Sequence, residues 1–237
     1  ITKVAAFALL GKAYLYEGKF AQAATALENV ITSGKYSLVT DYNSIFEMDG
    51  ENGAESVFEV QYTDIEGAGF GCLQCSEGNV AVGFSGVRNF SGPLFSSGFS
   101  FNVPTKEGAD AFEAGDKRKD VAILDIAAFA AANSNYDGGK GVSYGKGNED
   151  TGYFNRKYLP RKRSTAAAGD LNLTNPNNYR AIRYADVLLM AAEAYSRAGN
   201  NDAKAREYLN QVRRRAFGDN NHDITASGQA LTDFIYA

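Results

Sequence analysis

The stretch YRAIRYADVLLMAAEAYSRAGNNDAKAREYLNQVRRRAF, residues 179–217, decides the fold. It holds two helical patterns that meet at a polar turn. Gly199 ends the first pattern, and Asn200-Asn201-Asp202 offers side-chain oxygens that can cap the second. Apolar residues recur at three- and four-residue steps, first at Ile182, Ala185, Leu188, Leu189, Ala192 and Tyr195, then at Ala205, Leu209, Val212 and Ala216. In the second pattern, we expect three arginines to lie on the solvent-facing side of the helix, namely Arg206, Arg213 and Arg214. The stretch therefore predicts a helical hairpin.

A second copy of this pattern lies near the start, in residues 8–31, ALLGKAYLYEGKFAQAATALENVI. A small residue follows a leucine, and a tyrosine, a turn glycine, an alanine and a large apolar residue come after it, as in tetratricopeptide repeats. Tyr195 and Gly199 keep the spacing of Tyr14 and Gly18. The sequence therefore predicts a mainly α fold built on two tetratricopeptide-like helical hairpins.

Composition places the chain among ordinary globular proteins. It has 237 residues, of which 44% are hydrophobic and 22% charged. A net charge of −4 argues against a dedicated nucleic-acid binder, and no apolar run approaches membrane-spanning length. The chain begins inside a helical pattern and ends in an apolar segment, so we expect it to be an excerpt of a longer protein. Missing targeting signals would then carry no information.

The region between the hairpins has a different composition. Of the 25 glycines, 18 fall between Gly50 and Gly152. Alternating residues predict a strand over 55–62, Pro104-Thr105 opens a short helix through Phe112, and residues 121–132 form a helix or a strand. Tyr153–Arg163 predicts another strand. We expect one domain, in which a loop-rich insert over 50–165 is displayed between hairpins at 1–34 and 179–217, where binding groups usually lie.

Cys72 and Cys75 form a CxxC motif within a glycine-rich loop. There is no second CxxC and only one histidine, so zinc binding has little support. The strand and helix that flank a thioredoxin-like pair are absent from the pattern. Three interpretations stay open: packed thiols, a local disulfide in an oxidising compartment, and a redox or metal-binding pair.

The sequence gives little support to catalysis. His222 is the single possible base for a Ser-His-Asp triad, and no nucleophile-elbow motif accompanies it. Paired carboxylates could serve glycoside hydrolysis, but the three-residue steps of Asp110, Glu113 and Asp116 predict a solvated helix face. We expect neither catalysis nor a cofactor.

A calcium loop is suggested by Asn133-x-Asn135-x-Asp137-Gly138. The twelfth position holds Tyr144 where an EF-hand requires glutamate, so the run fails as an EF-hand. A looser calcium site stays open.

Several segments together resemble the SusD/RagB family of outer-membrane nutrient-binding lipoproteins. Residues 34–38 (GKYSL), Phe46 and residues 55–62 (ESVFEVQY) are similar to the family's GxYxL…F…E-[SI]-[IV]-F-E-[IV]-Q run. Residues 183–194, RYADVLLMAAEA, resemble its most specific motif, and LNQVR follows at 209–213. The middle signature of the family is matched by Glu77-Gly78-Asn79, Arg88, Gly98-Phe99, Pro104-Thr105, Phe112 and Asp116-Lys117-Arg118. The family's lipid-bearing amino-terminal part and a later helix rich in Glu and Arg have no counterpart in this sequence.

The resemblance implies a surface-exposed lipoprotein of the cell outer membrane. Such proteins bind glycan without catalysis and deliver it to a SusC-like TonB-dependent transporter. An aromatic ring can cover the apolar face of a sugar, while amide and guanidinium groups bind its hydroxyls. The candidate glycan-binding residues are Phe70, Asn79, Phe84, Arg88, Asn89, Phe90, Phe99 and Phe101. Phe99 stands where relatives often carry tryptophan, and this chain has no tryptophan.

Two alternatives stay open. Each phenylalanine could instead pack the insert against the scaffold, since phenylalanine is often buried. The hairpins could also form a tetratricopeptide-type scaffold that binds a peptide or protein partner in its groove. Exposed aromatic side chains on the insert would favour a sugar binder, and aromatic side chains inside the helical groove would favour a peptide binder.

Overall fold

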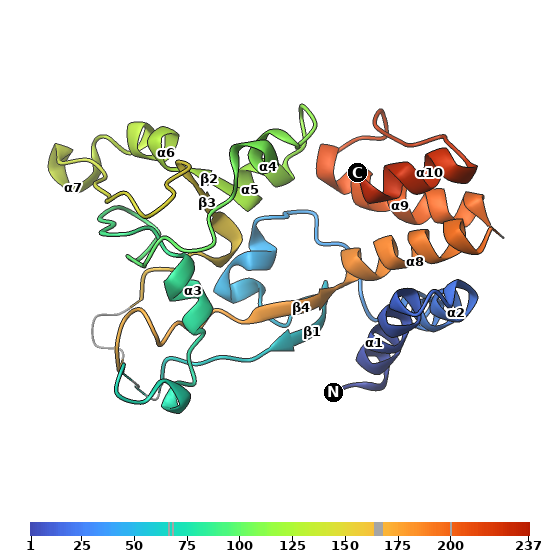
Figure 1. The fold of residues 1–237 in the computed structure, drawn as a ribbon, viewed down its shortest axis with the longest axis horizontal. Coiled ribbons are helices and arrows are strands. Elements are labelled where there is room, and N and C mark those ends of the chain that lie inside the picture. The colour runs from blue at the N-terminus through green and yellow to red at the C-terminus, as the bar shows by residue number, and fades with distance from the viewer. Residues whose placement is uncertain (66, 68, 164–167, 200) are drawn as a thin grey trace. The chain divides into compact units, whose positions relative to one another are not determined.

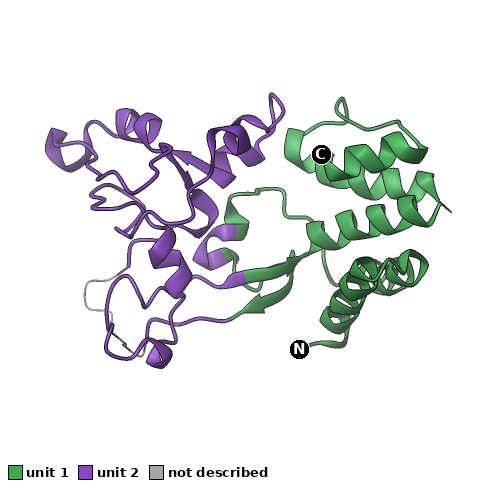
Figure 2. Ribbon diagram, in the orientation of Figure 1, with its two compact units in different colours: residues 1–45, 50–60, 180–237 green, residues 46–49, 61–179 purple. Residues whose placement is uncertain are grey.

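The computed structural model describes residues 1–65, 67, 69–163, 168–199 and 201–237. These residues form two compact units (Figure 2). The helical unit comprises Ile1–Ile45, Gly50–Val60 and Arg180–Ala237. The loop unit comprises Phe46–Asp49 and Gln61–Tyr179. The first strand predicted within the insert thus belongs to the helical unit.

The helical unit contains both predicted hairpins (Figure 1). Its helices are α1 (Lys3–Tyr16), α2 (Phe20–Ile31), α8 (Tyr184–Ala198), α9 (Asp202–Phe217) and α10 (Gly228–Tyr236). The chain returns from the loop unit and packs α8 against α2, so the second hairpin stacks on the first. Gly11 permits close packing of α1 on α2, because a Cβ there would lie 2.5 Å from Cγ of Leu27. The mainly α prediction is confirmed.

The predicted turn of the second hairpin is confirmed. Gly199 adopts the left-handed conformation at φ 67° and ends α8. Oδ1 of Asn201 accepts a hydrogen bond from the backbone N–H of Lys204 at 3.0 Å and caps α9. Of the other two proposed caps, Asp202 is the first residue of α9, and Asn200 lies outside the described residues.

The first helix of that hairpin begins later than predicted. Tyr179–Arg183 form strand β4, which pairs with β1 (Ser56–Val60) in a two-stranded sheet, so placing Ile182 on the helix was wrong. The carboxylate of Asp186 accepts a hydrogen bond from the backbone N–H of Arg183 at 2.8 Å and fixes the start of α8.

The sequence pattern suggested that three arginines of α9 face solvent, and this was wrong, because each of them binds the segment that follows the helix. The chain after α9 folds back over the helix, and the arginines bind it. Nε of Arg213 donates to the carbonyl of His222 at 2.7 Å, and Arg214 forms an ion pair with Asp223 at 2.6 Å. Nη1 of Arg206 donates to the carbonyl of Ala226 at 3.1 Å. These bonds fix the segment that leads into α10.

A polar network joins the two hairpins inside the helical unit. Glu28 of α2 accepts hydrogen bonds from Tyr195 and Tyr208 and forms an ion pair with Lys204 at 2.8 Å. Burial pushes the pKa of Glu28 upward, but the bonds from these three groups outweigh it and lower that pKa. Burial, and then the bond to Glu28, raise the pKa of Tyr208 to about 12. The network therefore favours a charged Glu28 and a neutral Tyr208.

The loop unit consists of short elements around a small core. They are η3 (Leu73–Cys75), α3 (Val80–Ser85), α4 (Lys106–Asp110), α5 (Arg118–Ala122), β2 (Ile123–Asp125), α6 (Ile126–Ala132), α7 (Tyr136–Gly139), β3 (Tyr153–Asn155) and η4 (Arg156–Tyr158). Two further 3-10 turns, η1 (Ser44–Phe46) and η2 (Met48–Gly50), lie where the chain passes between the units. Strands β2 and β3 pair antiparallel with Leu124 opposite Phe154. Both side chains are buried in the core of this unit.

The predicted helix after Pro104 is confirmed as α4, and Oγ1 of Thr105 caps it by accepting from the N–H of Gly108 at 3.1 Å. The helix ends at Asp110, so the predicted solvated face over three carboxylates was wrong. Asp116 lies beyond it, is buried, and pairs with Arg118 at 2.6 Å.

Residues 121–132 contain both predicted alternatives, because β2 runs directly into α6. The strand predicted over Tyr153–Arg163 covers only Tyr153–Asn155. Beyond it the chain turns away, and Arg161 pairs with Glu47 at 2.8 Å.

The calcium-like run belongs to a turn after α6. Asn133 donates its amide to the carbonyl of Phe129 at 2.8 Å, and Asp137 forms an ion pair with Lys140. Within the described ranges, no group of three or more His, Cys, Asp or Glu side chains is arranged to hold a metal ion. Across the same ranges, no helix combines the length and the apolar character that crossing a bilayer requires.

Candidate functional site

Four of the predicted phenylalanines meet in the loop unit. We call Phe70, Phe84, Phe99 and Phe101 the aromatic cluster. The ring of Phe99 lies 6.3 Å from that of Phe70, 5.6 Å from that of Phe84 and 6.2 Å from that of Phe101, centroid to centroid. These distances are in the range in which aromatic pairs attract each other.

The aromatic cluster is open to solvent on part of its surface. Phe70 is 58% exposed and Phe101 is 50% exposed, whereas Phe84 and Phe99 are half-buried. A group of large apolar side chains that stays in contact with water is typical of a binding surface. The two exposed rings, Phe70 and Phe101, thus pack against the partly buried rings of Phe84 and Phe99.

The backbone that carries these rings is held by close packing of two segments. The N–H of Phe99 donates to the carbonyl of Gly83 at 3.2 Å, and the N–H of Phe101 donates to the carbonyl of Phe84 at 2.9 Å. Gly98 makes this approach possible, because a Cβ there would overlap with the carbonyl oxygen of Gly83 and with Cα of Gly86. Glycine at position 98 is therefore a steric requirement of the site.

The same region concentrates unusual backbone conformations. Asn89, Leu94, Ser100 and Asn102 adopt positive φ, between 50° and 66°. This left-handed region is disfavoured for side chains with a Cβ, above all for leucine, and each such residue costs on the order of 1 kcal/mol. Residues in this state cluster at ligand sites, where surrounding contacts hold them.

Arg88 braces the aromatic cluster. Its Nη2 donates to the carbonyl of Phe99 at 3.1 Å, and its backbone N–H donates to Oγ of Ser100 at 2.8 Å. Its Nε is buried and has no hydrogen-bond acceptor among the residues that the structure describes. The neighbouring Asn89 is exposed. Arg88 therefore fixes the loop that carries Phe99.

Two predicted residues lie away from the aromatic cluster. Asn79 is 4% exposed, and its amide donates to the carbonyl of Asn177 at 2.9 Å. Phe90 is 8% exposed and packs 6.3 Å from Phe95 and 6.3 Å from Phe129 in the core of the loop unit. Phe90 thus packs in the core, which is the alternative that the sequence left open for each phenylalanine, whereas Asn79 joins two backbone segments through its buried amide.

A neighbouring segment adds groups that the sequence did not single out. The N–H of Gly145 donates to the carbonyl of Arg88 at 2.7 Å, and a Cβ at Gly147 would lie 2.5 Å from Cβ of Ser100. This segment exposes Tyr144, Lys146 and Asn148. The signal was a tyrosine and a lysine set between glycines in VSYGKGN, a composition typical of binding loops.

The CxxC motif forms a disulfide between Cys72 and Cys75, which confirms the interpretation as a local disulfide over that of packed free thiols. It closes the 3-10 turn η3, only two residues from Phe70. The disulfide is thus part of the surroundings of the aromatic cluster.

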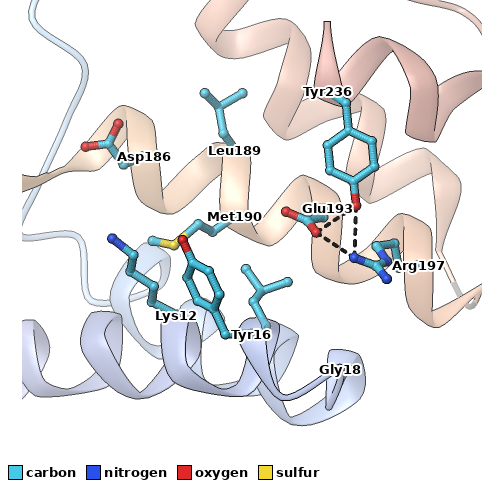
Figure 3. A pocket seen from close by; sticks show the side chains of 10 residues that line it. Lys12, Tyr16, Gly18, Asp186, Leu189, Met190, Glu193, Arg197 and Tyr236 are labelled. Carbon is cyan, nitrogen blue, oxygen red and sulfur yellow. Dashed lines mark hydrogen bonds and ion pairs between the residues drawn. The ribbon is translucent and has the colours of Figure 1, made fainter.

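The helical unit has a cavity of about 650 Å³ lined by residues of α1, α8 and α10 (Figure 3). Leu15, Leu189 and Met190 form part of its apolar lining. Glu193 accepts hydrogen bonds from Arg197 at 3.1 Å and from the hydroxyl of Tyr236 at 2.8 Å. These polar groups bind one another.

Comparison with known proteins places the chain in a family. The model of the SusD family matches residues 52–236. "SusD-like protein P2" of Formosa agariphila is 28% identical over 221 residues, which cover 91% of this chain and 41% of that protein. The chain thus spans less than half the length of this relative.

Solved structures give the same result. A "Laminarin binding SusD-like protein" is 34% identical with a TM-score of 0.82, over 98% of this chain and 50% of its own. "Surface glycan-binding protein A from Bacteroides thetaiotaomicron in complex with laminarihexaose" is 25% identical with a TM-score of 0.82, over the same shares of the two chains. Sequence motifs, fold and comparisons agree, and the chain belongs to the SusD family.

Proposed function

We propose that this chain binds glycan through the aromatic cluster of the loop unit, without catalysis. The observation that carries the proposal is the pair of half-exposed rings, Phe70 and Phe101, held on a base formed by Phe84 and Phe99. A sugar ring has apolar C–H faces that pack on an aromatic ring, and covering both excludes water from apolar surface.

Polar groups near the aromatic cluster suit the hydroxyls of a sugar. Asn89 and Asn102 are exposed and offer amide donors and acceptors, and Tyr144 and Lys146 are exposed on the neighbouring segment. Few of these groups are charged, which fits a neutral polysaccharide better than a strongly anionic one.

A β-1,3-linked glucan of the laminarin type is the ligand that we propose. Two of the similar structures are named as a laminarin-binding protein and as a complex with laminarihexaose. The ring planes of Phe70 and Phe99 meet at 83°, while those of Phe99 and Phe101 meet at 26°. The exposed surface is therefore angular, and this suits a β-1,3-glucan, which curves, better than an extended β-1,4-glucan ribbon.

We further propose that the full-length protein is a surface-exposed lipoprotein of the outer membrane that passes glycan to a SusC-like TonB-dependent transporter. Family membership supports this proposal, because the family that the sequence resembles consists of outer-membrane nutrient-binding lipoproteins. The Cys72–Cys75 disulfide is also typical of proteins outside the reducing cytosol.

The peptide-binding alternative would use the cavity of the helical unit. That cavity has two exposed aromatic lining residues, Tyr16 at 84% and Tyr236 at 57%, and the hydroxyl of Tyr236 is engaged with Glu193 and Arg197. The cluster of aromatic side chains lies in the loop unit instead. By the criterion set by the sequence, the glycan proposal has the stronger support.

Affinity electrophoresis of the full-length protein tests the proposal. Native gels would contain laminarin, hydroxyethylcellulose, starch or xylan, and bovine serum albumin would serve as a non-binding standard. We expect retardation in laminarin and little or none in the β-1,4-linked polymers. Equal mobility in every gel would contradict glycan binding, and retardation only in another glycan would contradict the laminarin assignment.

A further inference from the structure

The most exposed ring of the aromatic cluster stands on a weakly packed backbone. Phe70 lies between Gly69 and Gly71, and a Cβ added at either glycine would meet no atom within 4 Å. Glycine has the largest backbone freedom of any residue. Packing of the flanking residues therefore does not explain why Phe70 rests against Phe99.

Two successive turns meet at Cys72. The N–H of Cys72 donates to the carbonyl of Gly69 at 3.0 Å, which closes a turn that contains Phe70. The carbonyl of Cys72 accepts from the N–H of Cys75 at 3.1 Å, which closes the next turn. The disulfide joins the ends of this second turn, where the two Cα atoms are 5.3 Å apart.

The chain beyond Cys75 is firmly anchored within the loop unit. Oγ of Ser76 donates to the carbonyl of Leu173 at 2.9 Å, and the N–H of Asn79 donates to the carbonyl of Asn175 at 2.7 Å. A Cβ at Gly78 would overlap with the backbone of Thr174, so the two segments are in close contact. The disulfide thus connects the turn of Phe70 to an anchored segment.

We propose that the Cys72–Cys75 disulfide is a positioning element of the glycan site and holds Phe70 in place for the sugar. This inference rests on the proposed function. Without the disulfide, the glycine-flanked turn has more conformations, and glycan binding must order it at a cost in affinity. Cys72 and Cys75 are positioning residues, because they act through Phe70 rather than on the sugar.

Calorimetric titration with laminarihexaose tests this inference on four full-length proteins. They are the wild type, C72S/C75S, F70A, and the protein with all three substitutions. We expect C72S/C75S to bind about 3- to 10-fold more weakly than the wild type, as ordering one side chain and its turn suggests. In the F70A background, removal of the disulfide should cause no further loss. This non-additivity would not arise from a merely structural role.

Reduction supplies a test without substitution. Dithiothreitol converts the disulfide to two thiols and is itself oxidised to its cyclic disulfide. It should lower the affinity of the wild type to that of C72S/C75S and leave C72S/C75S unchanged. Unchanged affinity on reduction, or an equal loss with and without Phe70, would overturn the inference while the proposed function stands. Absence of glucan binding by the oxidised wild type would overturn the proposed function and the inference together.

Discussion

At the scale of single residues, the exposed rings of the aromatic cluster bear the proposed function. Phe101 is half exposed and is braced by its neighbours, with its ring 6.0 Å from that of Phe84 and 6.2 Å from that of Phe99. A ring held in this way loses little freedom when a sugar packs on it, so most of the gain from burial is available for binding.

Replacement of Phe101 by alanine should weaken binding of laminarihexaose by about 1 kcal/mol, or roughly fivefold, because one stacking surface is lost. Calorimetric titration measures the change. The matched control is Tyr16→Ala, which removes an aromatic ring that is 84% exposed in the helical unit. Equal losses in the two variants would contradict the assignment of the site to the aromatic cluster.

At the scale of elements, the packing of residues 98–101 against 83–87 sets the geometry of the site. Gly98→Ala would force a Cβ onto the backbone of Gly83 and Gly86, which cannot move aside as a flexible side chain could. We expect a loss of about 1–3 kcal/mol in the free energy of unfolding, together with weaker glucan binding.

Gly108→Ala is the matched control for this variant, because a Cβ at Gly108 would lie 3.6 Å from Oγ1 of Thr105, an ordinary contact. Alanine also favours a helix over glycine, so Gly108→Ala should leave stability unchanged or slightly raised. Urea unfolding followed by circular dichroism compares the two. Similar stability of both variants would show that the close approach at Gly98 is not required.

Elements that are specified by residues close together in the sequence could be predicted from it. Both hairpins follow from apolar periodicity and from caps such as Gly199 and Asn201, all of which lie within one or two helical turns of one another. Strand β4 was missed because its partner β1 is far away in the sequence and its apolar residues continue the period of α8. A local sequence pattern does not show that a strand pairs with a segment that is distant in the sequence.

The candidate site could be predicted in part. The composition of the insert pointed to the four phenylalanines that meet in the aromatic cluster. It could not separate them from Phe90, because burial depends on residues such as Phe95 and Phe129 that fold around it. Tyr144 was overlooked because its segment is joined to that of Arg88 by a hydrogen bond from the backbone N–H of the neighbouring Gly145 to the carbonyl of Arg88.

At the scale of the whole molecule, stability of the helical unit should depend on the network that joins its hairpins. Glu28→Gln removes the charge that faces Lys204 and should lower the free energy of unfolding at pH 7 by about 1 kcal/mol. Glu17→Gln is the control, because the Glu17–Lys19 pair is exposed and such pairs contribute little. Urea unfolding of both variants provides the comparison, and equal midpoints would contradict a role for the network.

The same network predicts the pH dependence of stability. The pKa of Glu28 lies below its ordinary value of 4.5 in the folded state, so its contribution is present above pH 4.5 and is lost as pH falls further. The pKa of Tyr208 is raised from 10.0 to about 12, so its contribution is lost as pH rises through this interval. Glu28→Gln should flatten the acid side of the profile. An acid side as steep as that of the wild type would contradict this assignment.

Hydrogen–deuterium exchange of the full-length protein with and without laminarihexaose tests the central claim most directly, because it locates the ligand in the molecule. We predict that bound glucan slows exchange in residues 69–76, 83–101 and 143–148 and leaves residues 12–18 and 186–197, which line the helical cavity, unchanged. Slower exchange at the helical cavity with no change in the loop unit would contradict the account and favour the scaffold alternative.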